Sequence, residues 1–436
     1  MANSEQSRKW TVSMDLWATV AAIAVAILLI VMATQAQAQT LSVLHTFSGS
    51  GDGAVSTAGL TMDHAGNFYG TTSIGGAAYG TAGYGTVFKL SRAGTGWILR
   101  TIYSFQGGDD GANPYAGVVF GPDGALYGTT SDSGDPEDYP GTNHDGTCGT
   151  CGQVFRLAPP SHACVSFSCP WTKTVLYRFT AAGGDGAYPG YGNLTFDAAG
   201  NIYGTTTSGG GDGGNCDPYN NCGVVFKLTR SGESWTESVL YSFSQTGNAG
   251  IIPESGVVLD SAGNVYGTTF LGGPGGSGGG AAYQLTRSGS SWTLTVLHDF
   301  GESNDGGNPF GGMIIDQQGN LYGTTGDGPG SNDGGTVFEF QPSGDSWTYS
   351  TLAVLPADAG PEDTPIMDAA GNLYATGVGG IVFKLTHSGG VWTYNLLHDL
   401  NGQPIGGVVV DANGNLYGTT EDTSGSAWGE VWELTP

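Results

Sequence analysis

The hydrophobic and polar positions of the chain follow one pattern of four short apolar runs, repeated along most of its length. In the copy that starts near Gly256, the first run is 256–260 and the second is 264–269, with a Ser-Ala-Gly turn between them. A glycine-rich loop leads to a third run, 281–285, and a second turn leads to a fourth, 294–300. Valine, threonine and aromatic residues dominate these runs, which is typical of β-strands. Four such runs joined by turns predict a four-stranded antiparallel sheet.

The second run carries a phrase of the form Gly-Asn-x-Tyr-Gly-Thr-Thr that marks seven copies of the pattern. Its tyrosines are Tyr69, Tyr127, Tyr203, Tyr266, Tyr322, Tyr374 and Tyr417, spaced 43 to 76 residues apart. Repeats of about this length are typical of the blades of a propeller. The 79 glycines recur at fixed places beside aromatic residues, so they mark turns and do not indicate disorder.

The last copy lacks its fourth run, and the missing run is found at the other end of the chain. The sequence stops after a third run at 431–434, while 41–47 matches the pattern of a fourth run. A strand from the N-terminus that completes the last blade leaves no broken blade. We predict an all-β fold, a seven-bladed β-propeller of four-stranded antiparallel blades closed by strand 41–47. It forms one domain, 39–436.

The first 38 residues differ from the repeats. Arg8 and Lys9 precede an apolar stretch, 16–33, and Ala36-Gln37-Ala38 has the pattern of a signal peptidase site. We interpret 1–38 as a signal peptide and predict an exported protein that is secreted, periplasmic or at the cell surface. An uncleaved N-terminal anchor is the alternative, because 18 apolar residues are at the lower limit for crossing a bilayer.

The formal net charge of −26 limits the choice of partners. A surface this acidic repels phosphate groups, so we expect no nucleic-acid partner, and membrane contact only through an uncleaved N-terminal segment. Solubility alone explains the charge, and a cationic partner is the alternative. We expect a monomer.

Six cysteines form three local pairs, which are Cys148 with Cys151, Cys164 with Cys169, and Cys216 with Cys222. In an exported protein such pairs predict disulfides that fasten long loops. The first and third pairs fall in loops between second and third strands, and the middle pair falls in a loop between third and fourth strands. Because these loop types emerge on opposite faces, we expect Cys164 to pair with Cys169. The other four cysteines form disulfides or, alternatively, one zinc site.

The recurring units resemble a known family of repeats. Residues 319–325, 335–338 and 346–348 are similar to the tandem repeats of the GloVer group of exported bacterial proteins, and the likeness covers nearly everything after Gln39. The segment 411–417 also resembles, more loosely, the inner hairpin of NHL-type propellers. The resemblance implies an exported repeat protein, without an established activity or a catalytic residue. Members of the group often carry C-terminal anchors, whereas this chain ends inside a blade.

One aspartate recurs in the loops that lead from a fourth strand to the next first strand. It is Asp52, Asp110, Asp185 and Asp305, each followed by glycine. On a propeller these loops share a face with the loops between second and third strands, and this is the usual ligand face. The carboxylates are therefore candidates for binding calcium or the hydroxyl groups of a sugar. The simpler interpretation is that each aspartate caps its own turn. No other cofactor is evident.

The longest loop, 131–151, contains acids around a histidine that other copies lack, including Glu137 and His144. This composition is typical of a metal or acid–base site, and also of a solvated insertion. Two functional hypotheses follow. The first is an exported binding or scaffold propeller whose loop face holds a glycan or an extracellular protein. The alternative is a carbohydrate-active hydrolase or lyase that uses Asp110, Glu137, His144 and Asp185. The blades repeat regularly, and the sequence contains no recognisable set of catalytic residues that occurs only once. This favours the binding module.

Overall fold

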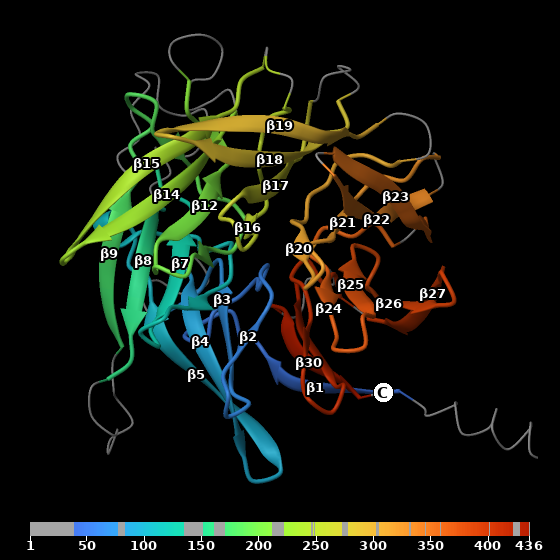
Figure 1. Ribbon diagram of the computed structural model, residues 1–436. Coiled ribbons are helices and arrows are strands. Elements are labelled where there is room, and N and C mark those ends of the chain that lie inside the picture. Colours follow the sequence, from blue (N-terminus) through green and yellow to red (C-terminus); the bar gives the residue numbers. More distant parts are fainter. Residues whose placement is uncertain are drawn as a thin grey trace, which may run out of the picture.

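The computed structural model is a ring of seven blades around a central axis (Figure 1). It describes residues 39–435 except 77–82, 135–150, 161–170, 212–221, 246, 248, 273–277, 302–304, 331–332, 345, 358, 401 and 422–427. Each blade is a four-stranded antiparallel sheet. The prediction of a seven-bladed all-β propeller is confirmed.

The strands of each blade follow one order from the axis outward. The first strands are β2 (Thr61–Met62), β6 (Val119–Phe120), β11 (Thr195–Phe196), β16 (Val258–Leu259), β20 (Ile314–Ile315), β24 (Ile366–Met367) and β28 (Val409–Val410). The second strands are β3 (Phe68–Thr72), β7 (Leu126–Thr130), β12 (Ile202–Thr206), β17 (Val265–Thr269), β21 (Leu321–Thr325), β25 (Leu373–Gly377) and β29 (Leu416–Thr420). The third strands are β4 (Thr86–Ala93), β8 (Gln153–Ala158), β14 (Val224–Ser231), β18 (Ala281–Ser288), β22 (Asp333–Ser343), β26 (Ile381–Ser388) and β30 (Glu430–Thr435). The fourth strands are β5 (Gly96–Ser104), β9 (Thr172–Arg178), β15 (Ser234–Ser242), β19 (Ser291–Asp299), β23 (Ser346–Pro356), β27 (Val391–Asp399) and β1 (Thr40–Thr46).

The outer hairpins are longer than the apolar runs predicted. In the fourth blade β18 and β19 pair as far as Ser288 and Ser291, so the turn consists of Gly289 and Ser290 alone. Gly289 has φ 64°, which glycine adopts without steric cost in a two-residue turn. The apolar pattern missed these ends because they project into solvent and carry exposed polar residues.

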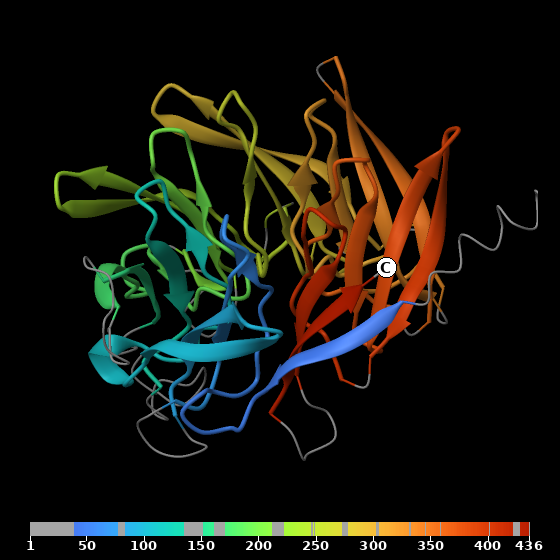
Figure 2. The ribbon, with the colours of Figure 1, turned by 90° about the horizontal axis from the view of Figure 1, so that it is seen from below.

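The N-terminal strand closes the ring. β1 pairs antiparallel with β30 from Thr40 opposite Thr435 to Thr46 opposite Glu430. Figure 2 shows the blue N-terminal strand beside the red C-terminal strand. Phe47 then packs edge-on against Phe88 of the first blade, with ring centroids 5.4 Å apart. The predicted closure by segment 41–47 is thus confirmed.

Neighbouring blades pack through aromatic residues at the ends of the fourth strands. The phenylalanine that follows a fourth strand contacts an aromatic ring in the third strand of the next blade. The pairs are Phe105–Phe155, Phe179–Phe226, Phe243–Tyr283 and Phe300–Phe338, with ring centroids 5.1 to 5.3 Å apart. All of these rings are buried. Because burial of each large aromatic side chain is a major stabilising contribution, this repeated contact accounts for much of the stability of the ring.

The repeated phrase also explains how the blades are linked by hydrogen bonds. The first threonine of Gly-Thr-Thr donates its hydroxyl to a backbone carbonyl that precedes the first strand of the next blade. These bonds join Thr71 to Ala116, Thr205 to Ser255, Thr268 to Gly311, Thr324 to Asp363 and Thr419 to Ala58, at 2.6 to 3.0 Å. The phrase is therefore an element of the fold, and its recurrence needs no functional explanation.

The structure describes no helix long and apolar enough to cross a membrane. Residues 1–38, and with them the signal peptide and the alternative anchor, lie outside the described residues. Both interpretations stay predictions.

We expect the chain to depend on β1 for its stability. A variant that begins at residue 48 loses β1 and Phe47, which leaves the outer edge of β30 unpaired and prone to pair with other chains. Its melting temperature should fall, and larger species should appear in size-exclusion chromatography, relative to a chain that begins at residue 39. Equal melting temperatures for the two chains would contradict the role assigned to β1.

Candidate functional site

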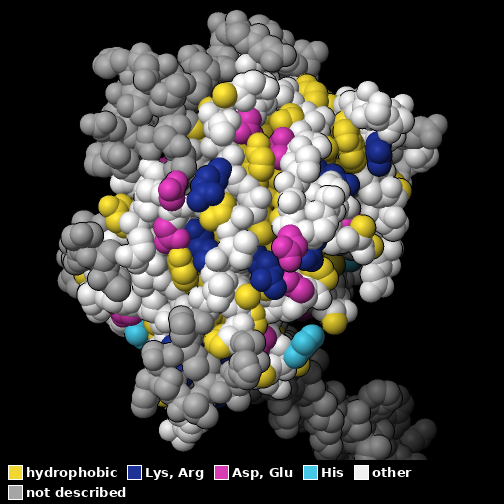
Figure 3. All heavy atoms as spheres, turned by 90° about the vertical axis from the view of Figure 1, so that its left-hand side faces the viewer, with side chains coloured by type: hydrophobic (Ala, Val, Ile, Leu, Met, Phe, Trp, Pro, Cys, Tyr) yellow, Lys and Arg dark blue, Asp and Glu magenta, His cyan; other side chains and the backbone are white. Residues whose placement is uncertain are grey.

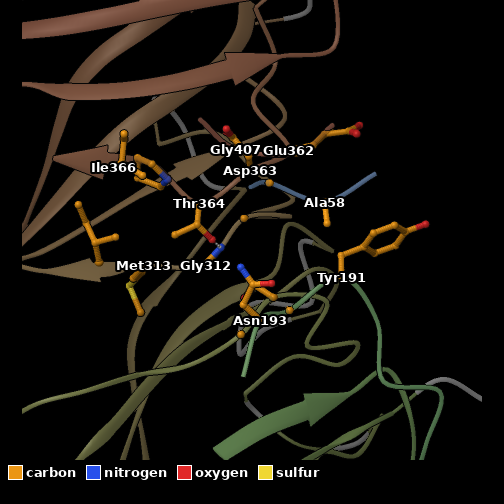
Figure 4. A pocket seen from close by; sticks show the side chains of 18 of the residues that line it. Ala58, Tyr191, Asn193, Gly312, Met313, Glu362, Asp363, Thr364, Ile366 and Gly407 are labelled. Carbon is orange, nitrogen blue, oxygen red and sulfur yellow. Dashed lines mark hydrogen bonds between the residues drawn. The ribbon is translucent and has the colours of Figure 1, made fainter. Parts of the chain in front are cut away.

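The first strands surround a cavity of about 500 Å³ at the centre of the ring. Residues from blades 1, 3, 4, 5, 6 and 7 line it. In Figure 4 the side chains of Tyr191 and Glu362 extend toward one side, and Met313 and Ile366 lie on the opposite side. The cavity therefore has an apolar part and a polar part, and its volume is in the range of small-ligand sites.

A single backbone geometry shapes the loops before the first strands. In blade 4, Ile252 has φ 60°, a left-handed conformation that is costly for a β-branched residue. Its N–H donates to the Cys222 carbonyl of the preceding blade at 3.1 Å, and its carbonyl accepts from the N–H of Phe270 at 2.9 Å. The conformation recurs at Val55, Asn113, Tyr188 and Asn308. In these five blades such bonds hold the start of the first strand in place, so the side chains that follow have defined positions.

The side chains that closely follow the left-handed residue differ from blade to blade. Six of the seven loops contain a proline, and the residue that follows it is Tyr115, Glu254, Phe310, Glu362 or Ile405, with Tyr191 two residues after the proline in blade 3. The predicted aspartates lie nearer the other end of these loops, before the position of the proline. The sequence did contain a pattern that could have indicated these cavity residues. In most of the loops a proline and a glycine recur, and the residue after the proline varies from blade to blade.

Four aromatic rings form a row at the polar side of the cavity. The centroid of Tyr191 is 5.3 Å from that of Tyr115 and 5.4 Å from that of Phe310, and Phe310 is 5.4 Å from Phe270. Tyr191 and Phe310 line the cavity, and Tyr191 is 37% exposed although it is a large ring. A partly exposed aromatic row beside a cavity is typical of a surface that binds a ligand.

Three glutamates lie near enough to this aromatic row for their charges to act on Tyr191. Burial, together with the charges of Glu254, Glu421 and Glu362, raises the pKa of Tyr191 to about 12. Burial, and secondarily the charge of Glu362, raises the pKa of Glu254 to about 7. Burial also raises the pKa of Glu362 and of Glu421, and the charge of Glu421 adds to the effect on Glu362. We call these three glutamates and the four aromatic residues the mouth cluster.

Asp363 lines the cavity beside Glu362 in the sequence, and an aspartate occurs in blade 6 alone among the equivalent positions. It is only 5% exposed, and burial raises its pKa to about 7 despite hydrogen bonds that favour the charged form. Its Oδ2 accepts from the N–H and the hydroxyl of Thr376 at 3.1 and 3.0 Å. Its Oδ1 has no hydrogen-bond partner among the described atoms, and the same holds for Oε2 of Glu254.

The four predicted aspartates are not brought together by the fold. Each bonds within its own loop or to the tyrosine or histidine near the end of the preceding fourth strand, and Asp110 also pairs with Lys173 of β9 at 3.0 Å. Asp52 contacts His45 at 3.0 Å, Asp110 accepts from Tyr103 at 2.6 Å, and Asp305 contacts His298 at 2.9 Å. Asp185 accepts from the N–H of Thr180 at 2.8 Å. None of the four lines the described cavity. The geometry favours turn capping, and their role in ligand binding stays a prediction.

Several predicted residues lie outside the described residues. They are Glu137, His144, Cys148, Cys164, Cys169 and Cys216. Cys151 and Cys222 are buried and neither is a free thiol, while the pairing of the six cysteines stays a prediction. Among the described residues no three histidine, cysteine, aspartate or glutamate side chains are placed to hold a metal ion.

Basic side chains lie on the outer side of the ring. Arg156 pairs with Asp123 at 2.6 Å, and Lys227 pairs with Asp197 at 3.6 Å. Figure 3 shows one side of the molecule, where lysine and arginine side chains lie among aspartate and glutamate side chains. By contrast, no described residue that lines the cavity is basic.

Comparison with known proteins identifies a family and a set of structures with a similar fold. The model of the Gloeobacter/Verrucomicrobia repeat matches residues 30–216 and 213–432. No curated protein matches the sequence. Similar solved structures include a candidate 6-phosphogluconolactonase from Bacteroides uniformis, with 13% identity, TM-score 0.47, and coverage of 78% of this chain and 83% of that one.

Two further structures are a gluconolactonase from Xanthomonas campestris and PorZ, a surface component of the type-IX secretion system of Porphyromonas gingivalis. The gluconolactonase has 16% identity and TM-score 0.36, and the match covers 60% of this chain and 74% of that one. PorZ has 13% identity and TM-score 0.48, and the match covers 86% of this chain and 46% of that one. At this level of similarity the activities of these proteins do not extend to this chain.

We expect Asp185 to act on stability. Asp185→Ala removes the acceptor for the N–H and hydroxyl of Thr180 and for the N–H of Gly186. Leaving these donors unpaired should lower the free energy of unfolding by about 1–3 kcal/mol in a denaturant titration. The exposed Asp109→Ala is the control and should change it little. An unchanged stability of the Asp185 variant would argue against turn capping.

We expect Asp363 to make stability depend on pH. Its pKa is raised in the folded state, so the folded protein holds this proton more tightly than the unfolded chain does. Ionisation of this carboxyl therefore lowers the free energy of unfolding progressively as the pH rises from about 4 to 7. Asp363→Asn should be more stable than the wild type at pH 8, and the difference should shrink toward pH 5 in thermal melts. A difference in melting temperature that is equal at both pH values would contradict this assignment.

Proposed function

This chain belongs to the Gloeobacter/Verrucomicrobia repeat family, and we propose that it is an exported binding module that holds a glycan at the mouth of its central cavity. The observation that carries the proposal is the row of rings formed by Tyr115, Tyr191, Phe310 and Phe270. Flat aromatic faces suit the apolar face of a sugar ring, while carboxylates beside them accept hydrogen bonds from sugar hydroxyls. A row of several rings suits a chain of sugars better than a single one.

The shape of the site supports a glycan over an extracellular protein. Protein partners usually bury a broad surface of about 800 Å² on each side. The mouth cluster instead lies beside a cavity of about 500 Å³, which suits the end or a short stretch of a narrow polymer. The acidic surface supports the prediction that nucleic acids do not bind.

A second candidate function is the hydrolysis or lyase cleavage of a glycan. One observation favours it, which is that burial raises the pKa of Glu254 to about 7. A carboxyl that is partly protonated near neutral pH suits a general acid. A second carboxyl of the mouth cluster, such as Glu362, would then act as base or nucleophile.

We expect Tyr191 to decide glycan binding. The purified protein is incubated with a panel of microbial and plant polysaccharides, and co-sedimentation and released oligosaccharide are measured in the same tubes. Tyr191→Ala should weaken binding on the order of tenfold, because a central aromatic contact is lost, whereas Tyr191→Phe should keep most of it. Ile98→Ala, at an exposed position of an outer hairpin, is the control and should bind as the wild type does.

The outcomes separate the two functions. Retention without release supports the binding module, and release of oligosaccharide supports the enzyme. Retention that survives Tyr191→Ala would place the glycan elsewhere on the molecule. No retention of any polysaccharide would count against both glycan functions and leave an extracellular protein as the partner to seek.

A further inference from the structure

The mouth cluster holds more negative charge than a neutral sugar requires. Charges of three glutamates act on the single hydroxyl of Tyr191. One of them, Glu362, lines the cavity together with Asp363. Hydroxyl groups of a neutral glycan need hydrogen-bond acceptors, but amide and hydroxyl side chains supply these without mutual repulsion. The accumulation of acids is therefore a property of the site that glycan binding alone leaves unexplained.

These acids have no cationic partner in the described part of the chain. None of Glu254, Glu362, Glu421 and Asp363 forms an ion pair with a described residue. Elsewhere in the chain some partly buried aspartates are paired with a basic side chain, as Asp110 is with Lys173 at 3.0 Å. Unpaired carboxyls that are largely buried are costly to ionise, which explains the raised pKa values of all four groups.

Two buried oxygens in this region also lack hydrogen-bond donors. Oδ1 of Asp363 belongs to a side chain that is 95% buried and lines the cavity, and its other oxygen is held by Thr376. Oε2 of Glu254 is likewise buried without a donor among the described atoms. An unpartnered buried acceptor costs free energy, and a ligand that supplies N–H donors would recover it.

The aromatic row adds a second feature that suits a cation. A positive charge near the face of a tyrosine or phenylalanine ring is attracted by the electrons of the ring. Tyr191 and Phe310 place two such rings at the cavity, whose lining also includes Glu362. Aromatic faces and carboxylates together are the groups that bind an ammonium ion, whereas carboxylates alone suit a metal ion equally well.

We propose that the glycan bound at the mouth cluster carries free amino groups, so that the ligand is a polymer of amino sugars that are not acetylated. This inference rests on the proposed glycan-binding function and specifies its ligand. The sugar rings stack on the aromatic row while a protonated amine enters among the carboxyls of Glu254, Glu362 and Glu421. A protonated amine supplies three N–H donors and neutralises the repulsion between the acids.

We expect a strong preference for the amine over its acetylated form. Binding of a glucosamine tetramer, the fully N-acetylated tetramer and a cellulose tetramer to the full chain is measured by isothermal titration calorimetry at pH 6.5. The amine form should bind at least about tenfold more tightly than the other two, and its affinity should fall as NaCl is raised, since the extra interaction is between charges.

Charge-neutral variants test which residues carry this preference. Glu254→Gln and Glu362→Gln should each reduce the affinity for the amine tetramer about tenfold while leaving that for the acetylated tetramer nearly unchanged. Retained binding of the acetylated tetramer shows that the variant is folded and that the aromatic row is intact. Glu233→Gln, at an exposed position of an outer hairpin, makes the same chemical change far from the cavity and should leave all affinities unchanged.

The results distinguish failure of this inference from failure of the proposed function. Equal affinities for the three tetramers would overturn the amine preference and leave glycan binding standing. If no tetramer bound and the polysaccharide panel were also negative, both the amine preference and the proposed glycan binding would be overturned. Binding of a tetralysine peptide that depends on Glu362, without binding of the amine tetramer, would overturn the amino-sugar inference in favour of a basic peptide.

Discussion

The whole structure depends on closing a ring of seven blades whose ends are more than 380 residues apart in sequence. The β1–β30 ladder, which pairs Thr40 with Thr435, supplies that closure. Most blades offer the next blade the same contacts, a phenylalanine after the fourth strand and a threonine hydroxyl from the second strand. Blades that touch only their neighbours form an open array until the last interface is made, and closure buries that interface and its strand edge.

The central cavity is a consequence of that closure. First strands from different blades meet around the axis only when all interfaces are complete, and the loops before them are held by hydrogen bonds to the preceding blade. The bond from Ile252 to Cys222 is one of these links. The backbone at the mouth is thus nearly uniform from blade to blade, while the side chains on it vary. A repeated scaffold with variable side chains lets one fold present many different binding surfaces.

Electrostatics distinguishes the cavity from the rest of the molecule. Outside the cavity some acids are neutralised, as Asp123 is by Arg156, and hydrogen bonds and this ion pair lower the pKa of Asp123. At the mouth, burial raises the pKa of Glu254 and of Glu362, and no described lining residue is basic. Burying these ionisable carboxyls makes the folded protein less stable than it would be with a neutral cavity. Ionisable groups that reduce stability in this way are often found at functional sites.

The sequence by itself determined the number of blades, the order of strands and the closing strand, because these follow from local periodicity and turn chemistry that recur seven times. It also identified the loops that face the cavity. It did not identify the mouth cluster, because Tyr115, Tyr191, Phe270 and Phe310 are distant in sequence and occur once each. Recurrence drew attention instead to Asp185 and its equivalents, which bond within their own loops or to the preceding fourth strand. Only the tertiary structure decided which residues share the cavity, since that depends on how neighbouring blades are rotated about the axis. The burial that raises the pKa of Asp363 has the same origin, because no stretch of sequence encloses that side chain until the ring is closed.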